Sequence, residues 1–266
     1  MTSTDNQNFS APLGAGSIVS ESFSVLFGNL VKVVLLGFAG TLIGYLVNGA
    51  TLGFDVALGI DEPQIDLNNL AGFYAGIGIS TVVSMVVYGL VTGIVVQLAY
   101  DAKLGRSRPL GAYFGPALAA VVPVAVLSIV VGILTTIGMI ALIVGGLWVY
   151  AVFSATVPAI VIERAGFGGM GRSAGLTKGY RWPIVGTLIL VWVCIFILQF
   201  VITFVLGLLA AALGTTGIGL IILLLFAGLI GALGYGLGGI VVALIYARLR
   251  EIKEGVGVDQ IAAVFD

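Results

Sequence analysis

Residues 158–183 read PAIVIERAGFGGMGRSAGLTKGYRWP, and they join one apolar segment to another through a short polar stretch. The first apolar run ends at Ile162, and the charged pair Glu163-Arg164 follows it. A glycine-rich segment with three more cations then leads to Trp182-Pro183, where a long apolar run begins. Aromatic and cationic residues typically flank membrane spans at the interface with water. The pattern therefore predicts a membrane helix that leaves the bilayer, an interfacial segment, and a helix that re-enters.

The composition indicates a chain that lipid must solvate. Of the 266 residues, 60% are hydrophobic and only 9% are charged, whereas soluble domains carry about 25% charged residues. We therefore expect an all-α integral membrane protein that forms one multispanning domain. There is no histidine, and the single cysteine, Cys194, lies in an apolar run. This inventory excludes disulfides, Cys/His zinc sites and His-ligated haem, and we expect no cofactor and no metal.

Six apolar stretches reach the roughly 20 residues that a membrane-spanning helix needs. They lie near 30–50, 72–99, 112–135, 138–161, 183–212 and 218–246. Pro116, Pro123 and Pro158 lie within or at the ends of the third and fourth stretches. Proline is tolerated inside a membrane helix where neighbouring helices or water satisfy the backbone groups that it frees.

The cations gather on one side of these six spans. With six spans, the loops at 51–71, 136–137 and 213–217 share a side that has no Lys or Arg and carries Asp55, Asp61, Glu62 and Asp66. The other side holds both termini and the loops at 100–111 and 162–182. It receives all eleven cations: Lys32, Lys103, Arg106, Arg108, Arg164, Arg172, Lys178, Arg181, Arg248, Arg250 and Lys253. The positive-inside rule therefore predicts that both termini are cytoplasmic.

A weaker repeat suggests three helical hairpins. Each odd-numbered span follows a polar, partly amphipathic stretch, and each even-numbered span ends in an acid and a base. We expect three hairpins with amphipathic helices in the cytoplasmic interface, the first of them within 14–29. Residues 1–13 are expected to form a disordered cytoplasmic tail, and 14–254 the six-span domain. Residues 255–266 are expected to form a cytoplasmic tail with a short helix at 260–265.

Small residues at four-residue spacing predict close packing of membrane helices. Whether they pack within the chain or between copies is open. The positions chosen are Gly40, Gly44, Gly89, Gly93, Gly228, Gly231, Gly236 and Gly239.

The interfacial segment is the candidate binding site. Cations near anionic lipid each contribute roughly 1 kcal/mol to membrane binding, and Ser, Thr and Trp side chains add hydrogen bonds and a platform. The candidate contacts to a lipid headgroup or a partner are Arg172, Ser173, Thr177, Lys178, Arg181 and Trp182. Glu163 is expected to form a structural ion pair with Arg172 or Arg181.

Other chemistry has weaker support. Residues 166–171 fit the pattern GxGxxG and nearly fit a phosphate-binding loop, but both motifs need a preceding β-strand, so a flexible turn is the better interpretation. No Asp, Glu, Lys or Arg lies in the middle of a span, where proton relays and ion-coupled carriers usually need one. Gln97 and Gln199 would serve either as hydrogen bonds between helices or as polar groups facing a cavity. The acids available to an enzyme are Asp101, Glu163 and Glu251.

Two segments resemble a known family. Pro158-x4-Glu163 is followed by Arg172-Ser173, Leu176-Thr177, Gly179 and Arg181-Trp182, and the chain ends with Tyr246-x-Arg248-Leu249-Arg250-x-x-Lys253-Glu254-Gly255. These segments resemble the glycerophosphoryl diester phosphodiesterase membrane-domain group and related uncharacterised bacterial six-span membrane proteins. Ala174-Gly175 and Ala247 depart from that pattern. The resemblance implies a membrane domain without phosphodiesterase activity, because in fused members that chemistry belongs to a separate soluble domain.

The leading hypothesis is a non-catalytic protein of the bacterial inner membrane that organises lipid or serves as an accessory subunit of a membrane complex. Its expected partners are anionic lipids and either a partner complex or further copies of itself, with no nucleic acid. The alternative is a transporter or channel for a small or lipidic solute. An enzyme that modifies lipid is the third hypothesis.

Overall fold

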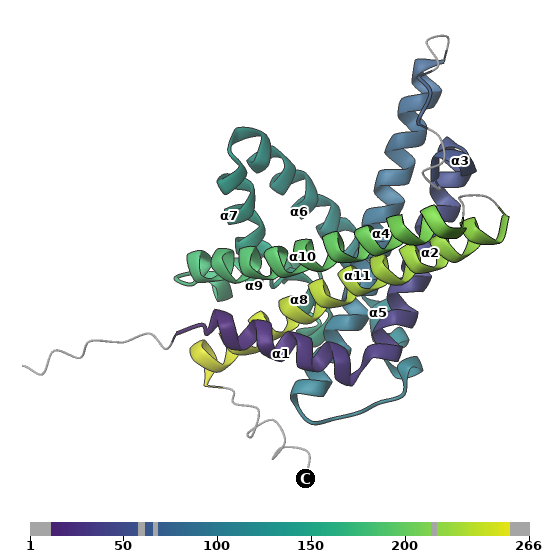
Figure 1. Ribbon diagram of the computed structural model, residues 1–266. Helices are drawn as coiled ribbons and strands as arrows, with labels where there is room; N and C mark the ends of the chain where they lie inside the picture. Colours follow the sequence, from purple (N-terminus) through teal and green to yellow (C-terminus); the bar gives the residue numbers. More distant parts are fainter. Residues whose placement is uncertain (1–11, 58–61, 66–68, 214–216, 256–266) are drawn as a thin grey trace, which may run out of the picture.

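The computed structural model describes residues 12–57, 62–65, 69–213 and 217–255, and within these ranges it contains helices and no strand (Figure 1). The predicted helix at 260–265 lies outside the described residues. The elements in chain order are α1 (Ala15–Gly28), α2 (Leu30–Leu52), α3 (Phe54–Ala57), α4 (Leu70–Lys103), η1 (Leu110–Tyr113), α5 (Phe114–Ala119), α6 (Val121–Ala141), α7 (Ile143–Phe153), α8 (Thr156–Glu163), η2 (Gly166–Gly168), α9 (Gly169–Thr177), α10 (Arg181–Leu213) and α11 (Gly217–Glu254).

Six helical segments are long and apolar enough to cross a membrane, which confirms the prediction of a multispanning membrane protein. Their bounds are Leu30–Leu52, Leu70–Lys103, Val121–Ala141, Ile143–Glu163, Arg181–Leu209 and Gly231–Glu254. The fourth consists of α7 and α8 with a break between them, and the sixth continues past the predicted end at 246 to Glu254.

Two boundaries in the third span need correction. The span was expected at 112–135, but a separate short helix, α5, ends at Ala119 and the span begins at Val121. Pro123 accounts for this break, because a proline lacks an N–H donor and its ring crowds the carbonyl group four residues earlier. The turn into the fourth span was expected at 136–137 and lies at Leu142. A Cβ on Gly138 would lie 3.0 Å from Gly146 Cα, so glycines allow the two helices to fold back tightly.

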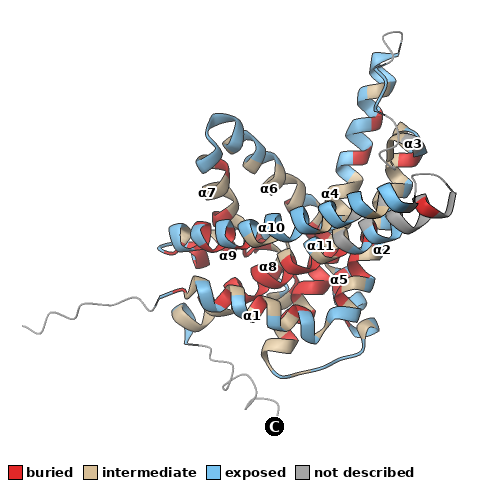
Figure 2. Ribbon diagram, in the orientation of Figure 1, coloured by how far each residue is buried: buried red, intermediate tan, exposed pale blue. Residues whose placement is uncertain are grey.

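Helix α11 is the centre of the packing. It packs against α2 and α4, and also against α1 and α10. Its C-terminal half is mostly buried up to Leu249, with Ile240, Leu244, Tyr246 and Leu249 almost fully buried. Figure 2 shows buried residues concentrated where α8, α9 and α11 meet, whereas the tips of α4 and of the α6–α7 pair are exposed or intermediate. The bundle is therefore packed tightly in one half and loosely in the other.

Seven of the eight glycines predicted to mediate helix packing lie against another part of the same chain. A Cβ on Gly239 would lie 2.8 Å from Val95, and one on Gly93 would lie 3.3 Å from Val161. The remaining contacts join Gly40 to Val91, Gly89 to Ser128, Gly228 to Phe38, Gly231 to Thr41 and Gly236 to Val33. The prediction for Gly44 is wrong, because a Cβ there would meet no described atom within 4 Å. Gly37 of α2, which is not among the eight predicted glycines, lies against the backbone of Ala232 in α11: a Cβ on Gly37 would lie 2.5 Å from Ala232 Cα.

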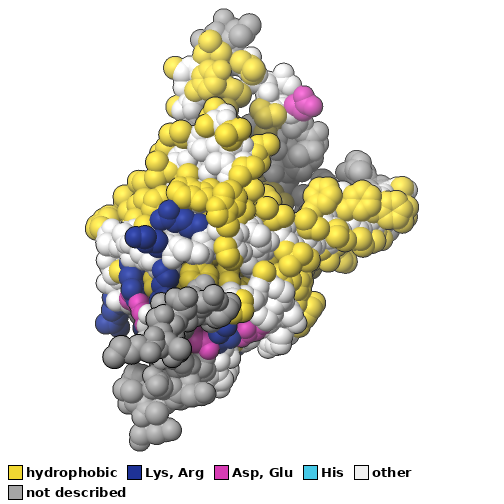
Figure 3. Space-filling model, turned by 90° about the vertical axis from the view of Figure 1, so that its left-hand side faces the viewer, with side chains coloured by type: hydrophobic (Ala, Val, Ile, Leu, Met, Phe, Trp, Pro, Cys, Tyr) yellow, Lys and Arg dark blue, Asp and Glu magenta, His cyan; other side chains and the backbone are white. Residues whose placement is uncertain are grey.

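One end of the bundle carries every Lys and Arg, and we call it the basic end. Helices α2 and α10 begin there, and α4, α8 and α11 end there. Side chains tie these ends together: Lys32 Nζ donates to Arg108 O at 3.0 Å, and Lys103 pairs with Glu21 of α1 at 2.6 Å. On the face shown in Figure 3, Lys and Arg gather below a broad apolar surface.

The N-terminal residues 12–28 pack against this end. Helix α1 buries Ile18, Ser22 and Leu26, which lie four residues apart and face α10 and α11. Of the predicted disordered tail 1–13, only Pro12 and Leu13 are described. Leu13 is buried, and Pro12 O accepts a hydrogen bond from Arg248, so the disorder expected for these two residues is a further correction.

Replacing Gly37 with alanine is expected to destabilise the bundle. The added Cβ would lie 2.5 Å from both Cα and the carbonyl oxygen of Ala232, and a helix backbone cannot yield as a side chain does. Overpacking of this kind costs about 1–3 kcal/mol. Thermal unfolding in detergent micelles measures the effect.

The matched control is Gly44→Ala, which gives the same gain in helix propensity and meets no neighbouring atom. The control should unfold at or above the wild-type temperature. Equal unfolding temperatures for the two variants would contradict the packing described.

Candidate functional site at the basic end

A break in the fourth span shapes the basic end. Helix α7 ends at Phe153 and α8 begins at Thr156. Pro158 explains the position, because its ring crowds the carbonyl group of Ser154 and it has no N–H to donate. The Val152 carbonyl and the Ala155 N–H at this break are paired by side chains, in a part of the chain that is buried among apolar residues. Such groups must find partners within the protein.

Helix α9 supplies those partners. Ser173 Oγ donates to Val152 O at 2.8 Å and accepts from the Ala155 backbone N–H at 3.1 Å. Thr177 Oγ1 lies 3.1 Å from the same Val152 carbonyl oxygen. Both side chains are 0% exposed, so the prediction that Ser173 and Thr177 contact a lipid headgroup or a partner must be corrected. They complete the broken span.

The chain reaches α9 through a turn that the glycines permit. Arg164 follows α8 in the left-handed conformation with φ 57°, and Gly166 is left-handed as well, with φ 52°. A Cβ on Gly169 would lie 2.6 Å from Ile160, so this glycine lets α9 lie directly on α8. The segment 166–171 is thus a 3-10 turn leading into a helix. It follows helix α8 and not a strand, so the structural setting of a nucleotide-binding loop is missing from this part of the chain.

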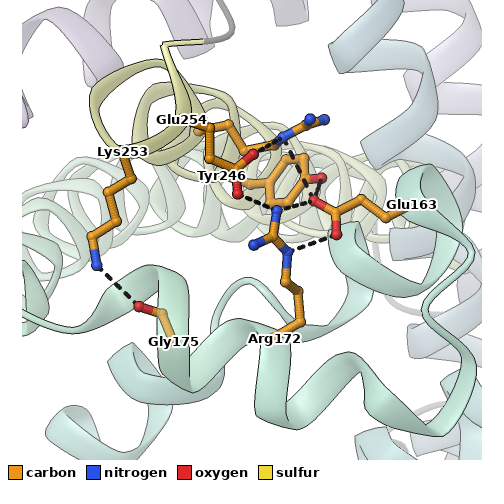
Figure 4. Close-up of polar contacts among 7 residues, drawn as sticks. Glu163, Arg172, Gly175, Tyr246, Lys253 and Glu254 are labelled. Carbon is orange, nitrogen blue, oxygen red and sulfur yellow. Dashed lines mark hydrogen bonds and ion pairs between the residues drawn. The ribbon is translucent and has the colours of Figure 1, made fainter.

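A network of charges joins α8, α9 and α11 (Figure 4). Arg172 donates to both carboxylate oxygens of Glu163, from Nε at 2.7 Å and from Nη2 at 2.8 Å, and it also donates to Glu254. The Tyr246 hydroxyl donates to Glu163 Oε1 at 2.6 Å. Arg250 pairs with Glu254 at 2.9 Å and lies 3.5 Å from Glu163. Of the two partners proposed for Glu163, the structure pairs it with Arg172.

This network fixes α9 in place. Charge-assisted and bidentate hydrogen bonds are the strongest of their kind. The hydrogen bonds to Glu163, and then those to Glu254, raise the pKa of the Arg172 guanidinium above its ordinary value. Because Arg172 is engaged by two carboxylates, its charge is compensated within the protein. Lys253 adds a further tie, since Nζ donates to Gly175 O at 2.9 Å and to Lys178 O at 2.7 Å at the end of α9.

Beside the network lies a group of cations that no described carboxylate pairs with. Lys178, Arg181 and Lys253 form it, and their positive charges lie close enough to repel one another. Arg181 stacks over Trp148 at 4.8 Å, and its Nε is buried without a hydrogen-bond partner among the described residues. Trp182 is 62% exposed next to them. We call these three cations with Trp182 the cationic patch.

The remaining candidates are engaged elsewhere. Gln97 donates to Gly93 O at 3.1 Å within its own helix and to Tyr113 O of η1 at 3.4 Å, as one of its two predicted roles requires. Gln199 is exposed and lies near Thr203. Asp101 pairs with Arg108 at 3.1 Å, and Glu251 pairs with Arg248 at 2.7 Å. Within the described ranges, no three His, Cys, Asp or Glu side chains converge in a way that would hold a metal ion.

Sequence reasoning missed the contribution of α11 to this site. Tyr246, Arg250 and Glu254 lie four residues apart and so share one face of the helix. That spacing was visible in the sequence, although the partner helix that the face meets was not.

The geometry describes a polytopic α-helical membrane protein with a sealed, charged end. Comparison with protein-family models, curated proteins and solved structures finds no significant match to this chain. The resemblance to the glycerophosphoryl diester phosphodiesterase membrane-domain group therefore stays a prediction.

Replacing Glu163 with glutamine is expected to lower stability by about 2 kcal/mol, because hydrogen bonds to a charged group are lost and Arg172 keeps only one carboxylate. The change preserves side-chain size, so packing is not altered. Thermal unfolding in detergent measures the loss.

Glu251→Gln is the control, because Glu251 belongs to a more exposed pair within α11. Exposed ion pairs contribute less than about 1 kcal/mol to the free energy of unfolding. A loss for Glu251→Gln as large as that for Glu163→Gln would contradict a special role for the network.

Proposed function

We propose that the protein is a non-catalytic component of a bacterial inner membrane, and that it associates with anionic lipid through the cationic patch. The observation that carries the proposal is that Lys178, Arg181 and Lys253 have no described carboxylate partner at the point where α10 begins. Like charges held together without counter-charge favour an anion, and each cation near anionic lipid contributes about 1 kcal/mol. The exposed ring of Trp182 suits the headgroup level of a bilayer.

The proposed orientation places the basic end, and with it both termini, in the cytoplasm. The one-sided distribution of Lys and Arg supports it. Labelling with an impermeant maleimide tests it in a Cys194→Ala background: in sealed cells Gln64→Cys should react and Gly168→Cys should not. The reverse pattern would overturn the orientation.

We further propose that the chain consists of three hairpins, each introduced by a helix in the cytoplasmic interface. Supporting this, α1, α5 and α9 each precede an odd-numbered span and are too short to cross a bilayer themselves. In this arrangement the interfacial helices and the cationic patch form the surface offered to lipid or to a partner complex. Because the described glycine seams are mostly occupied within the chain, a second copy would have to use another face.

Removal of two patch cations is expected to weaken binding of anionic lipid. Lys178→Gln/Arg181→Gln should lower the affinity for dioleoylphosphatidylglycerol in phosphatidylcholine nanodiscs by roughly thirty-fold, which corresponds to about 2 kcal/mol. Native mass spectrometry of the lipids retained by the protein measures it.

The control variant Arg108→Gln/Arg248→Gln removes the same charge from cations that are paired with Asp101 and Glu251. It should reduce the affinity by less than a factor of about three. An equal loss of affinity in both variants would mean that only the total charge matters, and not the position of the patch. No loss of affinity in either variant would refute the patch as a lipid site.

A second candidate function is movement of a small or lipidic solute across the membrane. One observation favours it, a cavity between the spans on the side away from the basic end. Gradient-dependent uptake into liposomes above that of empty vesicles would support transport, and its absence would count against it.

A further inference from the structure

A cavity of about 780 Å³ lies between α2, α4, α6, α7, α8, α10 and α11. This volume falls within the roughly 300–1,000 Å³ typical of small-molecule sites. Most of the wall is apolar, but hydroxyl groups from α4, α6, α7, α8 and α11 reach it, among them those of Ser80, Ser84, Tyr88, Ser128, Thr135 and Tyr150. The described lining contains no Asp, Glu, Lys or Arg.

Three of the hydroxyl groups in the wall lack a partner. Among the described residues, Thr92 Oγ1, Thr135 Oγ1 and Thr156 Oγ1 are buried and accept or donate no hydrogen bond. Thr156 is only 2% exposed. An unpaired hydroxyl in an apolar setting is destabilising, so a site that keeps three of them is suited to a ligand that brings the missing partners. Thr136, next to Thr135 on the same wall, instead donates to Gly132 O at 2.9 Å.

The cavity is closed toward the basic end and open at mid-depth. Its inner wall includes Val242 and Leu188, which are almost fully buried, whereas Trp192 on the same wall is 62% exposed. Trp192 follows Arg181 by eleven residues, which places it about 16 Å along α10 from the basic end. The hydrocarbon core of a bilayer is about 30 Å thick. With the basic end placed at the membrane interface, as proposed above, the mouth faces the hydrocarbon interior.

The outer wall diverges at that mouth. Helices α4 and α6 approach closely at Gly89, where a Cβ would lie 2.9 Å from Ser128 Oγ. Beyond that point, the tip of the α6–α7 pair and the N-terminal end of α4 stand apart in Figure 1. Met139, which lines the cavity near this tip, is exposed. A molecule dissolved in the bilayer can reach the hydroxyl groups without passing the charged network.

We propose that this cavity binds an uncharged lipid whose polar group carries hydroxyl or ester oxygens, of the diacylglycerol class. A charged headgroup would find no counter-charge in the wall, and the cost of an unpaired charge at the centre of a membrane is several kcal/mol. A purely apolar ligand would leave the wall hydroxyls unpaired. A neutral lipid with hydroxyl groups carries no charge and can pair with the wall hydroxyls. It reaches the cavity from the hydrocarbon, where its own polar group lacks hydrogen-bond partners. The inference does not depend on the cationic patch.

The test uses the full-length protein stripped of lipid, with dioleoylglycerol and dioleoylphosphatidylglycerol as probes in native mass spectrometry. Thr135→Val/Thr156→Val keeps side-chain shape and removes two of the three unpaired hydroxyls. It should lower the affinity for dioleoylglycerol about ten-fold or more, while thermal stability without lipid stays equal or rises, because unsatisfied buried groups are gone. A purely structural role for the threonines would instead lower stability and leave binding unchanged.

Two controls separate this site from others. Thr136→Val, on the same wall, should change dioleoylglycerol affinity by less than a factor of about two. Lys178→Gln/Arg181→Gln should weaken phosphatidylglycerol binding and leave dioleoylglycerol binding intact. Because the Lys178→Gln/Arg181→Gln variant is measured with both lipids, failure of the cationic-patch proposal can be told apart from failure of the cavity proposal.

A protection experiment covers the case in which the double variant does not fold. With Cys194→Ala, Ser84→Cys places a thiol on the cavity wall, and dioleoylglycerol should slow its reaction with a membrane-permeant maleimide at least five-fold. Three results would overturn the proposal: no saturable dioleoylglycerol binding by the wild-type chain, unchanged affinity in Thr135→Val/Thr156→Val, or equal protection by phosphatidylglycerol.

Discussion

Pro158 breaks the fourth span inside an apolar bundle, where side chains pair the backbone groups at the break. Ser173 and Thr177 reach across from α9 and pair with them. Because these contacts hold α9 against α7 and α8, they also place Arg172 between Glu163 and Glu254. The charged network, the enclosed half of α11 and the position of the cationic patch all depend on this repair of one backbone break.

The consequence is a molecule with two unlike halves. At the basic end, helix ends are tied by ion pairs and hydrogen bonds, and α11 is buried among its neighbours. In the other half, the spans diverge around a mostly apolar cavity that several hydroxyl groups reach. The two proposals follow this division, since the basic end offers uncompensated cations to anionic lipid and the cavity offers unpaired hydroxyls to a neutral one.

Much of the architecture could be predicted from the sequence, because the cost of placing charge in hydrocarbon leaves a plain pattern. The six spans and the gathering of all cations at one end follow from it. Most of the glycine contacts follow from the four-residue spacing of small residues. The turn at Leu142 could not be predicted, since three glycines permit it without any breaker residue. The roles of Ser173 and Thr177 also could not, because a hydroxyl suits a lipid headgroup and an orphaned carbonyl equally well. Only the tertiary fold, which brings α9 onto the break, decides between them. The cavity was missed for a similar reason: its hydroxyls come from several spans, and no local pattern marks them.

Hydrogen exchange of the segment 150–180 in lipid nanodiscs tests the central claim most directly. We expect backbone amides of α9 to exchange as slowly as those in the buried half of α11, and Ser173→Ala/Thr177→Val to make them exchange faster. This expectation would be contradicted if wild-type α9 exchanged at the rate of an unstructured interfacial loop, because the broken span would then have no fixed partner and the basic end would not be sealed as described.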